Sequence, residues 1–129
     1  MAWLLNLEGG IATKLVAIEA STTVFPGDSH EQVSLPYTQY QVAYRRDSDL
    51  QTGGPWIATI EVFGWHTSSD SALELGYDII AALEQKNAPI GGVNVRHVTA
   101  MQVYQVQQEK SPGVIENGIY VQFEALIDA

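Results

Sequence analysis

The chain contains three histidines, His30, His66 and His97, which are the side chains best suited to metal binding or proton transfer. His66 lies just before Asp70, and His97 begins a predicted strand, so these groups would form a metal site if the strand ends converged. Their spacings match no metal-binding motif, however, and isolated histidines of this kind are usually surface or loop residues. We therefore favour the second interpretation and predict no metal ligands.

A second candidate for chemistry is a run of carboxylates, Asp70, Glu74 and Asp78, followed by Glu84. The first three are spaced so that they share one face of a helix, and paired carboxylates suit general acid–base catalysis. The same residues fall in the first turns of a predicted helix, opposite its apolar stripe. Acidic groups there are ordinarily solvated and stabilised by the helix dipole. A solvated helix face is therefore the favoured interpretation.

No motif of a catalytic or cofactor-binding site occurs in the sequence. It has no phosphate-binding loop, G-x-S-x-G elbow, H-E-x-x-H zinc motif or EF-hand loop. The Gly-Gly pairs at 9–10, 53–54 and 91–92 lack the third glycine of a dinucleotide fingerprint. The absence of cysteine excludes disulfides, zinc knuckles and thiol catalysis. We therefore predict no catalytic residues, no cofactor and no enzymatic activity.

The basic pair Arg45-Arg46 stands out because the chain has only 6 lysines and arginines against 15 aspartates and glutamates. Asp47 and Asp49 follow it, and Trp56 begins the next predicted strand directly after Gly-Gly-Pro. A basic pair can meet an acidic patch on an identical neighbour, and an exposed tryptophan can anchor an interface. The pair can equally serve to keep a strand end soluble. Together these residues form the predicted protein interface.

Length and composition indicate a single domain that spans residues 1–129. Hydrophobic residues make up 46% of the chain and charged residues 16%, a balance typical of folded proteins. The net charge of -9 includes no basic stripe, which argues against binding a nucleic-acid backbone and would let DNA slide past. No segment has the roughly 18 apolar residues of a membrane span, and the N-terminus lacks a signal-peptide pattern. We expect a soluble, unprocessed protein.

Two segments have the period of an amphipathic helix. In residues 4–20, apolar side chains recur at spacings of three and four, which predicts one buried face. The pair Gly9-Gly10 inside this segment predicts either a kink or the close approach of another backbone. The second helix is predicted over 71–85, with Ser71 and Glu74 at the spacing of a capping box.

The remaining segments alternate with period two or form short apolar runs, as strands do. We predict strands at 37–46, 56–66, 93–108 and 118–127, and a short strand at 22–25. The polar connector 45–55 is longer than a hairpin needs, which is typical of a loop that makes a contact. The order α-β-β-α-β-β predicts an α+β fold with a mainly antiparallel sheet and two helices packed on one face.

The layout of these elements resembles a known family. A helix is followed by Pro36-Tyr37 at the start of a strand, and then by a polar loop. The strand WIATIEVFGWHTSS (56–69) runs straight into the helix SALELGYDIIAALEQ (71–85). The stretch NGIYVQFEALI (117–127) looks like a final strand after a turn. This pattern resembles the tail terminator, or tail completion, proteins of long-tailed bacteriophages.

The resemblance implies a structural protein that assembles as a ring, typically hexameric, on the last ring of the tail tube. Such a ring stops tube growth and joins the tail to the head. Its partners would be further copies of itself, the tail tube protein and a head-completion or neck protein, with no cofactor and no membrane. DNA would pass through an acidic lumen without specific binding. The implied location is the head-proximal end of the tail in the virion, after assembly in the host cytoplasm.

Two alternatives remain open at this point. The chain could be another ring component of the same neck or tail, such as a head-closure or tube protein, since all of these are small β-rich subunits. From a different class, it could be a small metal-dependent hydrolase that uses His66, His97 and acidic neighbours. Tightly bound stoichiometric zinc would support the hydrolase.

Overall fold

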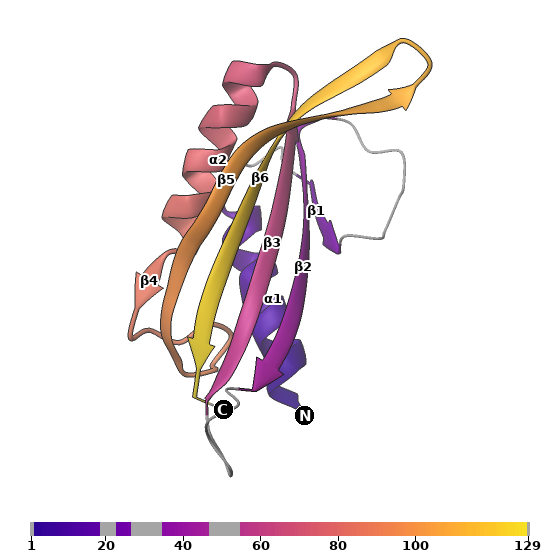
Figure 1. Cartoon of the computed structure of the whole chain (residues 1–129). Helices are drawn as coiled ribbons and strands as arrows, with labels where there is room; N and C mark the ends of the chain where they lie inside the picture. The colour runs from indigo at the N-terminus through magenta and orange to yellow at the C-terminus, as the bar shows by residue number, and fades with distance from the viewer. Residues whose placement is uncertain (1, 19–22, 27–34, 47–54, 129) are drawn as a thin grey trace.

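Both helices lie on the same face of a six-stranded sheet (Figure 1). The structure is a computed structural model that describes residues 2–18, 23–26, 35–46 and 55–128. In chain order the elements are α1 (Ala2–Val16), β1 (Thr23–Pro26), β2 (Tyr37–Arg46), β3 (Trp56–His66), α2 (Ser69–Leu83), β4 (Gln85–Lys86), β5 (Val95–Ser111) and β6 (Val114–Ile127). The sheet order is β1-β2-β3-β6-β5-β4.

Every neighbouring pair of strands is antiparallel except β1 with β2. The predicted α+β class, with a mainly antiparallel sheet and two helices, is therefore confirmed. The predicted order holds for the long elements, and the short strands β1 and β4 extend the sheet at its two edges.

Helix α1 buries the face that its apolar spacing predicts. Leu7, Ile11 and Leu15 are wholly buried, and the helix ends at Val16 rather than at residue 20. A Cβ at Gly10 would lie only 2.5 Å from the backbone nitrogen of Gly91. Glycine therefore lets the helix backbone touch the turn at 90–93, which is the close approach that the Gly-Gly pair predicted.

Helix α2 begins earlier than predicted because a different serine caps it. Ser68 is the N-cap, with extended backbone, and its Oγ accepts a hydrogen bond from the Ser71 amide at 3.1 Å. The predicted capping box, Ser71 with Glu74, is therefore wrong. The helix ends at Leu83 because Glu84 takes an extended conformation. Neither helix in the described part of the chain is long and apolar enough to cross a bilayer.

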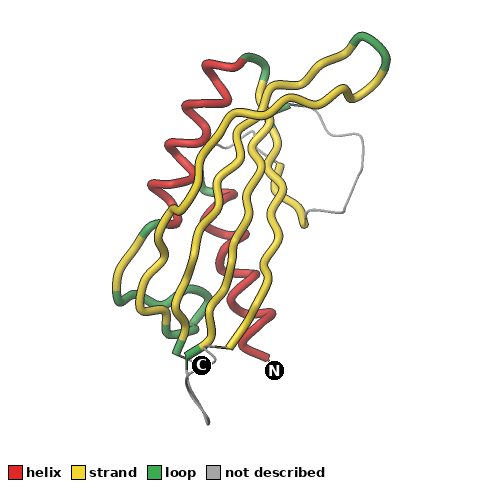
Figure 2. The backbone as a smooth tube through the Cα atoms, viewed as in Figure 1, coloured by secondary structure: helices red, strands yellow, loops and turns green. Residues whose placement is uncertain are grey.

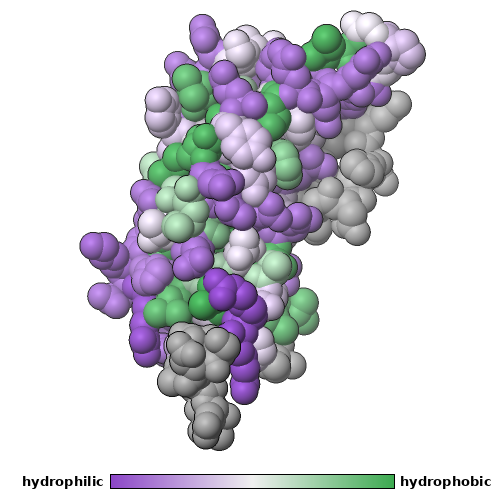
Figure 3. All heavy atoms as spheres, viewed as in Figure 1, coloured by the Kyte–Doolittle hydropathy of each residue, from purple (hydrophilic) through white to green (hydrophobic). Residues whose placement is uncertain are grey.

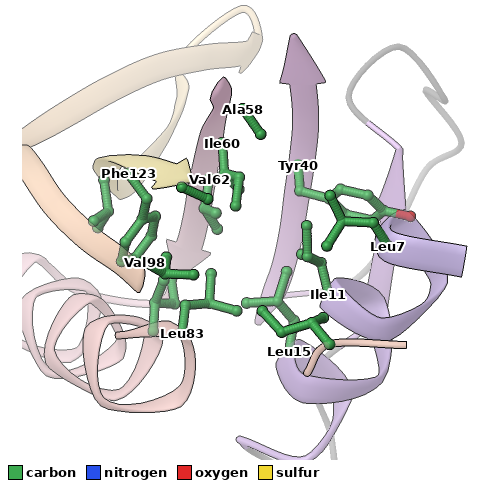
Figure 4. Packing of buried hydrophobic residues seen from close by; sticks show 14 of the residues in the cluster. Leu7, Ile11, Leu15, Tyr40, Ala58, Ile60, Val62, Leu83, Val98 and Phe123 are labelled. Atoms are coloured by element: carbon green, nitrogen blue, oxygen red, sulfur yellow. The ribbon is translucent and has the colours of Figure 1, made fainter. Parts of the chain in front are cut away.

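The core fills the space between the helices and the sheet (Figure 4). From α1, the side chains of Leu7, Ile11 and Leu15 point toward β2 and β3. The wholly buried members contributed by the sheet and by α2 include Ala58, Ile60, Val62, Ile79, Leu83, Val121, Phe123 and Ile127. Burying one such aliphatic or aromatic side chain stabilises a fold by roughly 1.5–3 kcal/mol, so this face of the sheet dominates the stability.

Strands β5 and β6 form a hairpin that continues beyond the other strands (Figure 2). The last residue pair between β3 and β6 is His66 with Asn117, so residues 108–116 pair only within the hairpin. We call residues 108–116 the arm. The last strand begins at Val114 and not at residue 118 as predicted, because residues 114–117 also pair with β5. The chain turns at Pro112-Gly113, where Gly113 has a φ of +79.

Candidate functional site

The sheet face opposite the helices is uncovered in the described part of the chain, and we call it the open face. Figure 3 views this side and shows mostly hydrophilic residues over the strands. Cross-strand neighbours form rows across β2, β3, β6 and β5. Two of these rows are Gln41–Glu61–Gln122–Gln102 and Gln39–Phe63–Tyr120–Tyr104. The open face therefore presents amides, carboxylates and aromatic rings where the covered face presents aliphatic groups.

Hydrogen bonds and ring contacts tie these rows together. Gln41 Nε2 donates to Glu61 Oε1 at 2.8 Å, and the Tyr120 hydroxyl donates to Glu61 Oε2. The centre of the Tyr120 ring lies 4.7 Å from the centre of the Tyr104 ring and 5.0 Å from the centre of the Phe63 ring. Burial, followed by the Glu61 carboxylate, raises the pKa of Tyr120 well above its ordinary value. The hydroxyl therefore remains a proton donor to Glu61 across the physiological range.

A shallow hollow of about 390 Å³ opens beside these rows, toward the arm. Trp65 forms part of its lining, and Trp65 Nε1 donates to Gln39 Oε1 at 2.9 Å. A Cβ at Gly118 would lie 2.5 Å from the Trp65 ring, so the glycine makes room for that ring on the neighbouring strand. The lining consists of amide, aromatic and aliphatic side chains from described residues. The hollow thus offers surface contacts rather than a general acid–base pair.

A buried carboxylate holds the base of the arm against β2. Glu116 is only 3% exposed, and its Oε1 accepts hydrogen bonds from the Tyr37 hydroxyl at 2.6 Å and from Gln108 Nε2 at 2.8 Å. Lys110 Nζ lies 3.3 Å from Glu116 Oε2 and 5.3 Å from the centre of the Tyr37 ring. We call Tyr37, Gln108, Lys110 and Glu116 the arm anchor.

The electrostatics of the arm anchor follow from these contacts. Burial alone would raise the pKa of Glu116, but hydrogen bonds from Tyr37 and Gln108 and the charge of Lys110 lower it below the ordinary value overall. Burial, and then the same carboxylate, raises the pKa of Tyr37 far above that of a free tyrosine. Both groups are therefore fixed in one protonation state near neutral pH. This arrangement suits a structural joint and not proton transfer.

The described members of the predicted interface, Arg45, Arg46 and Trp56, lie at the opposite end of the sheet from the arm anchor. Arg45 Nη2 is 3.7 Å from Glu124 Oε2, and the Arg46 guanidinium lies 5.0 Å from the centre of the Trp56 ring. Trp56 is half-buried and also packs against Trp3, with ring centres 5.8 Å apart. Asp47 and Asp49, and with them most of the loop 45–55, lie outside the described residues. The structure thus brings together Arg46 and Trp56 and leaves both arginines exposed.

The structure keeps the candidate metal ligands apart. On β6, the partner of His66 is Asn117 and that of His97 is Leu126, so the two histidines lie about 30 Å apart along the sheet. His30 lies outside the described residues. Among residues that the structure describes, no three or more His, Asp or Glu side chains group closely enough to hold a metal ion. The carboxylates Asp70, Glu74 and Asp78 are exposed on α2.

The arm anchor is the part of the site that the sequence did not reveal. Tyr37 and Glu116 are 79 residues apart, and their contact depends on the register of three strands. The available signal is that the stretch Val114–Ile127 contains two carboxylates, Glu116 and Glu124, and a carboxylate must find partners if it is buried. The signal does not tell which of the two is buried, and it does not identify Tyr37.

Comparison with known proteins gives a likeness in fold. No family model matches the sequence, and no curated protein matches it. Among solved structures, the chain is similar to one from the virion of a native gene transfer agent (GTA) particle. The TM-score is 0.69, with 95% of each chain covered and 14% of residues identical. The chain therefore has the fold of a component of that virion, at a sequence identity that shows the fold alone.

Proposed function

We propose that the chain is a structural virion protein that forms a ring, hexameric as in the tail terminator proteins, at the head-proximal end of a phage tail. The observation that carries this proposal is the fold shared with a gene transfer agent virion component over 95% of both chains. In this role the ring caps the tail tube, stops its growth and joins the tail to the head. Its partners are further copies of itself, the tube protein and a head-completion or neck protein.

The charge distribution supports a ring through which DNA passes without binding. The net charge of -9 repels the phosphate backbone. The few basic groups are also partly neutralised, because Arg45, Arg96 and Lys110 each pair with a carboxylate. The open face presents amides and hydrogen-bonded carboxylates in place of a basic stripe.

The geometry also favours assembly over catalysis. The hydrolase alternative requires His66 and His97 to meet, and the sheet holds them about 30 Å apart. The most elaborate polar cluster, the arm anchor, orients a protruding hairpin. A protein of this kind needs no cofactor, and its place is in the virion after assembly in the host cytoplasm.

Negative-stain electron microscopy of the concentrated protein, with light scattering on the same sample, tests the proposal. We expect closed rings with a central pore that do not stack. If the purified protein stays monomeric, it is mixed with tail tubes that lack a terminator, and rings are then expected only at one tube end.

Two results would count against the terminator role. Long cylinders formed by the protein alone would indicate a tube protein instead. Failure to bind tube ends, together with unregulated tube growth in its presence, would remove the terminator function altogether.

A further inference from the structure

Within the described residues, the outer edge of β5 has no partner strand over most of its length. Strand β4 pairs with only two β5 residues, His97 and Val98, and no other described strand lies along that side. Residues 102–108, between the irregularities near Met101 and Lys110, contain no charge, proline or glycine. Proteins usually protect long edges with such residues, because unpaired N–H and C=O groups recruit another strand.

The register of β5 with β6 shows which backbone amides of β5 point outward, away from β6. The Ala100 amide donates to Glu84 Oε2 at 2.9 Å, so it points away from β6 and toward the end of α2. Backbone groups alternate in direction along an antiparallel strand, and the irregularity at Met101 inserts one residue. The amides of Val103 and Gln105 therefore also point outward, where a further strand would bind.

An apolar strip on α2 runs beside this edge. Two contacts fix that flank of the helix against β5: Gln105 Nε2 donates to the Ser69 carbonyl at 3.2 Å, and Glu84 binds Ala100. Leu73 and Tyr77 lie one helical turn apart between these two points, and Tyr77 is 65% exposed. Val103, 45% exposed, pairs with the core residue Val121 and so lies on the helix side of the sheet. The edge and the strip together form a surface that suits an extended chain.

We propose that this surface binds the outer edge of β2 from a second copy of the chain. Strand β1 pairs with β2 only over residues 37–40, so within the described residues the outer edge at 41–46 has no partner strand. This edge ends in the exposed pair Arg45-Arg46, whereas the outer face of α2 carries exposed Glu74 and Asp78. The charges of the two ends are therefore complementary.

The strand directions agree with such a contact. Within one copy, β5 runs antiparallel to β2, because three antiparallel pairings separate them. A copy related by rotation about an axis tilted from the strands, as in a closed sheet, keeps those directions and shifts β2 along β5 beyond the residues that β4 pairs with, so the new β5–β2 pair is antiparallel as well. The two edges are different surfaces, and a head-to-tail contact of this kind closes into a ring when its rotation divides a full turn evenly. This inference rests on the proposed ring and names the interface that builds it.

Cysteine cross-linking tests the contact directly, because the natural chain has no cysteine. One variant carries Gln102→Cys or Tyr104→Cys on β5, and the other carries Gln41→Cys or Ala43→Cys on β2; all four positions are exposed. After the two variants are mixed and mildly oxidised, we expect a disulfide-linked heterodimer. A single chain with both cysteines should give a ladder of linked species. Ile115→Cys on the arm, mixed with Ala43→Cys, is the matched control and should stay unlinked.

The outcomes separate the inference from the proposed function. Absence of linkage above the control overturns the inference, and so does linkage of the β5 variant only with itself. Rings that form normally without linkage leave the proposed function standing and refute this interface. A linked ladder with no closed rings and no binding to tube ends supports the contact and refutes the terminator role.

Charge reversal provides a second test. One double variant carries Arg45→Glu and Arg46→Glu, and the other carries Glu74→Arg and Asp78→Arg. A sample that contains only one of these variants should not assemble, while its far-ultraviolet circular dichroism spectrum stays unchanged. Combining both pairs in one chain should restore assembly. Normal assembly of either single pair would contradict the charge complementarity.

Discussion

The two faces of the sheet are built from the same strands and differ in almost every other respect. The covered face holds wholly buried aliphatic and aromatic side chains, such as Ile60 and Phe123, that pack under two helices. The open face holds Glu61, Tyr120 and their hydrogen-bonded neighbours. Packing on the covered face supplies stability, whereas the specific contacts on the open face and at the arm anchor fix positions. Substitutions on the two faces should therefore lower the free energy of unfolding by different amounts, and these losses should depend differently on pH.

The largest effect is expected on the covered face. Phe123→Ala removes a wholly buried ring from the core and should lower the free energy of unfolding by about 3–5 kcal/mol. Its strand neighbour on the open face provides the control, because Gln122→Ala removes a half-buried amide and should cost well under half as much. Urea denaturation measures both. Equal losses would break the distinction between the faces.

A smaller effect is expected where the open face is tightly packed. Gly118→Ala places a Cβ 2.5 Å from the Trp65 ring and should cost about 1–3 kcal/mol through overpacking. The near-ultraviolet circular dichroism of the aromatic rings should change with it. The same substitution at Gly9, where a Cβ meets no atom within 4 Å, should instead stabilise α1 by roughly 0.5–1 kcal/mol. Unchanged stability of the Gly118 variant would show that the tryptophan ring yields easily.

The arm anchor should give a comparable loss that depends on pH. Glu116→Gln keeps the shape and removes the charge that Tyr37, Gln108 and Lys110 surround, with an expected cost of about 1–3 kcal/mol at neutral pH. The folded state lowers the pKa of Glu116, so its stabilisation is complete above the ordinary value of 4.5 and is lost as pH falls through the folded-state pKa. The variant should lack this component of the acid-induced loss. Thermal melts from pH 7 to pH 3 compare the two proteins.

The smallest effect is expected at the exposed end of β2. Arg45→Gln breaks a 3.7 Å ion pair with Glu124 between two exposed side chains, which is worth at most about 1 kcal/mol and less at high salt. Melting curves at low and high salt measure it. A salt-independent loss of several kcal/mol would mean that this pair is a structural element and would weaken its assignment to an interface between copies.

The covered face could be predicted from the sequence because its signal is periodic. Leu7, Ile11 and Leu15 repeat at the helical period, and alternate residues of β3 and β6 face the same core. The residues at which helices and strands begin were harder to predict from the sequence. Three serines lie within 68–71, and only the backbone geometry decides that Ser68 caps α2. The alternation pattern places the start of the last strand at residue 118, whereas pairing with β5 already begins at Val114.

The open face and the arm anchor could not be predicted, for a different reason. Their contacts join residues far apart in sequence, such as Tyr37 with Glu116 and Trp65 with Gln39 across neighbouring strands. Polar pairs of this kind follow from strand register, which period-two patterns do not specify across a whole sheet. The charge excess of the chain was visible at once, but the carboxylates that pair with Arg45, Arg96 and Lys110 were not.

The arm anchor also has a mechanical consequence. A two-strand hairpin that projects alone would bend at the point where it leaves the sheet, and a load on its tip would be lost there. Here Glu116 on β6 joins the hairpin to Tyr37 on β2, across the intervening strand β3, just at that point. The base of the arm therefore cannot bend away from the sheet without breaking the hydrogen bond between Tyr37 and Glu116. A load on the arm is carried to β2, the strand whose other end holds Arg45 and Arg46.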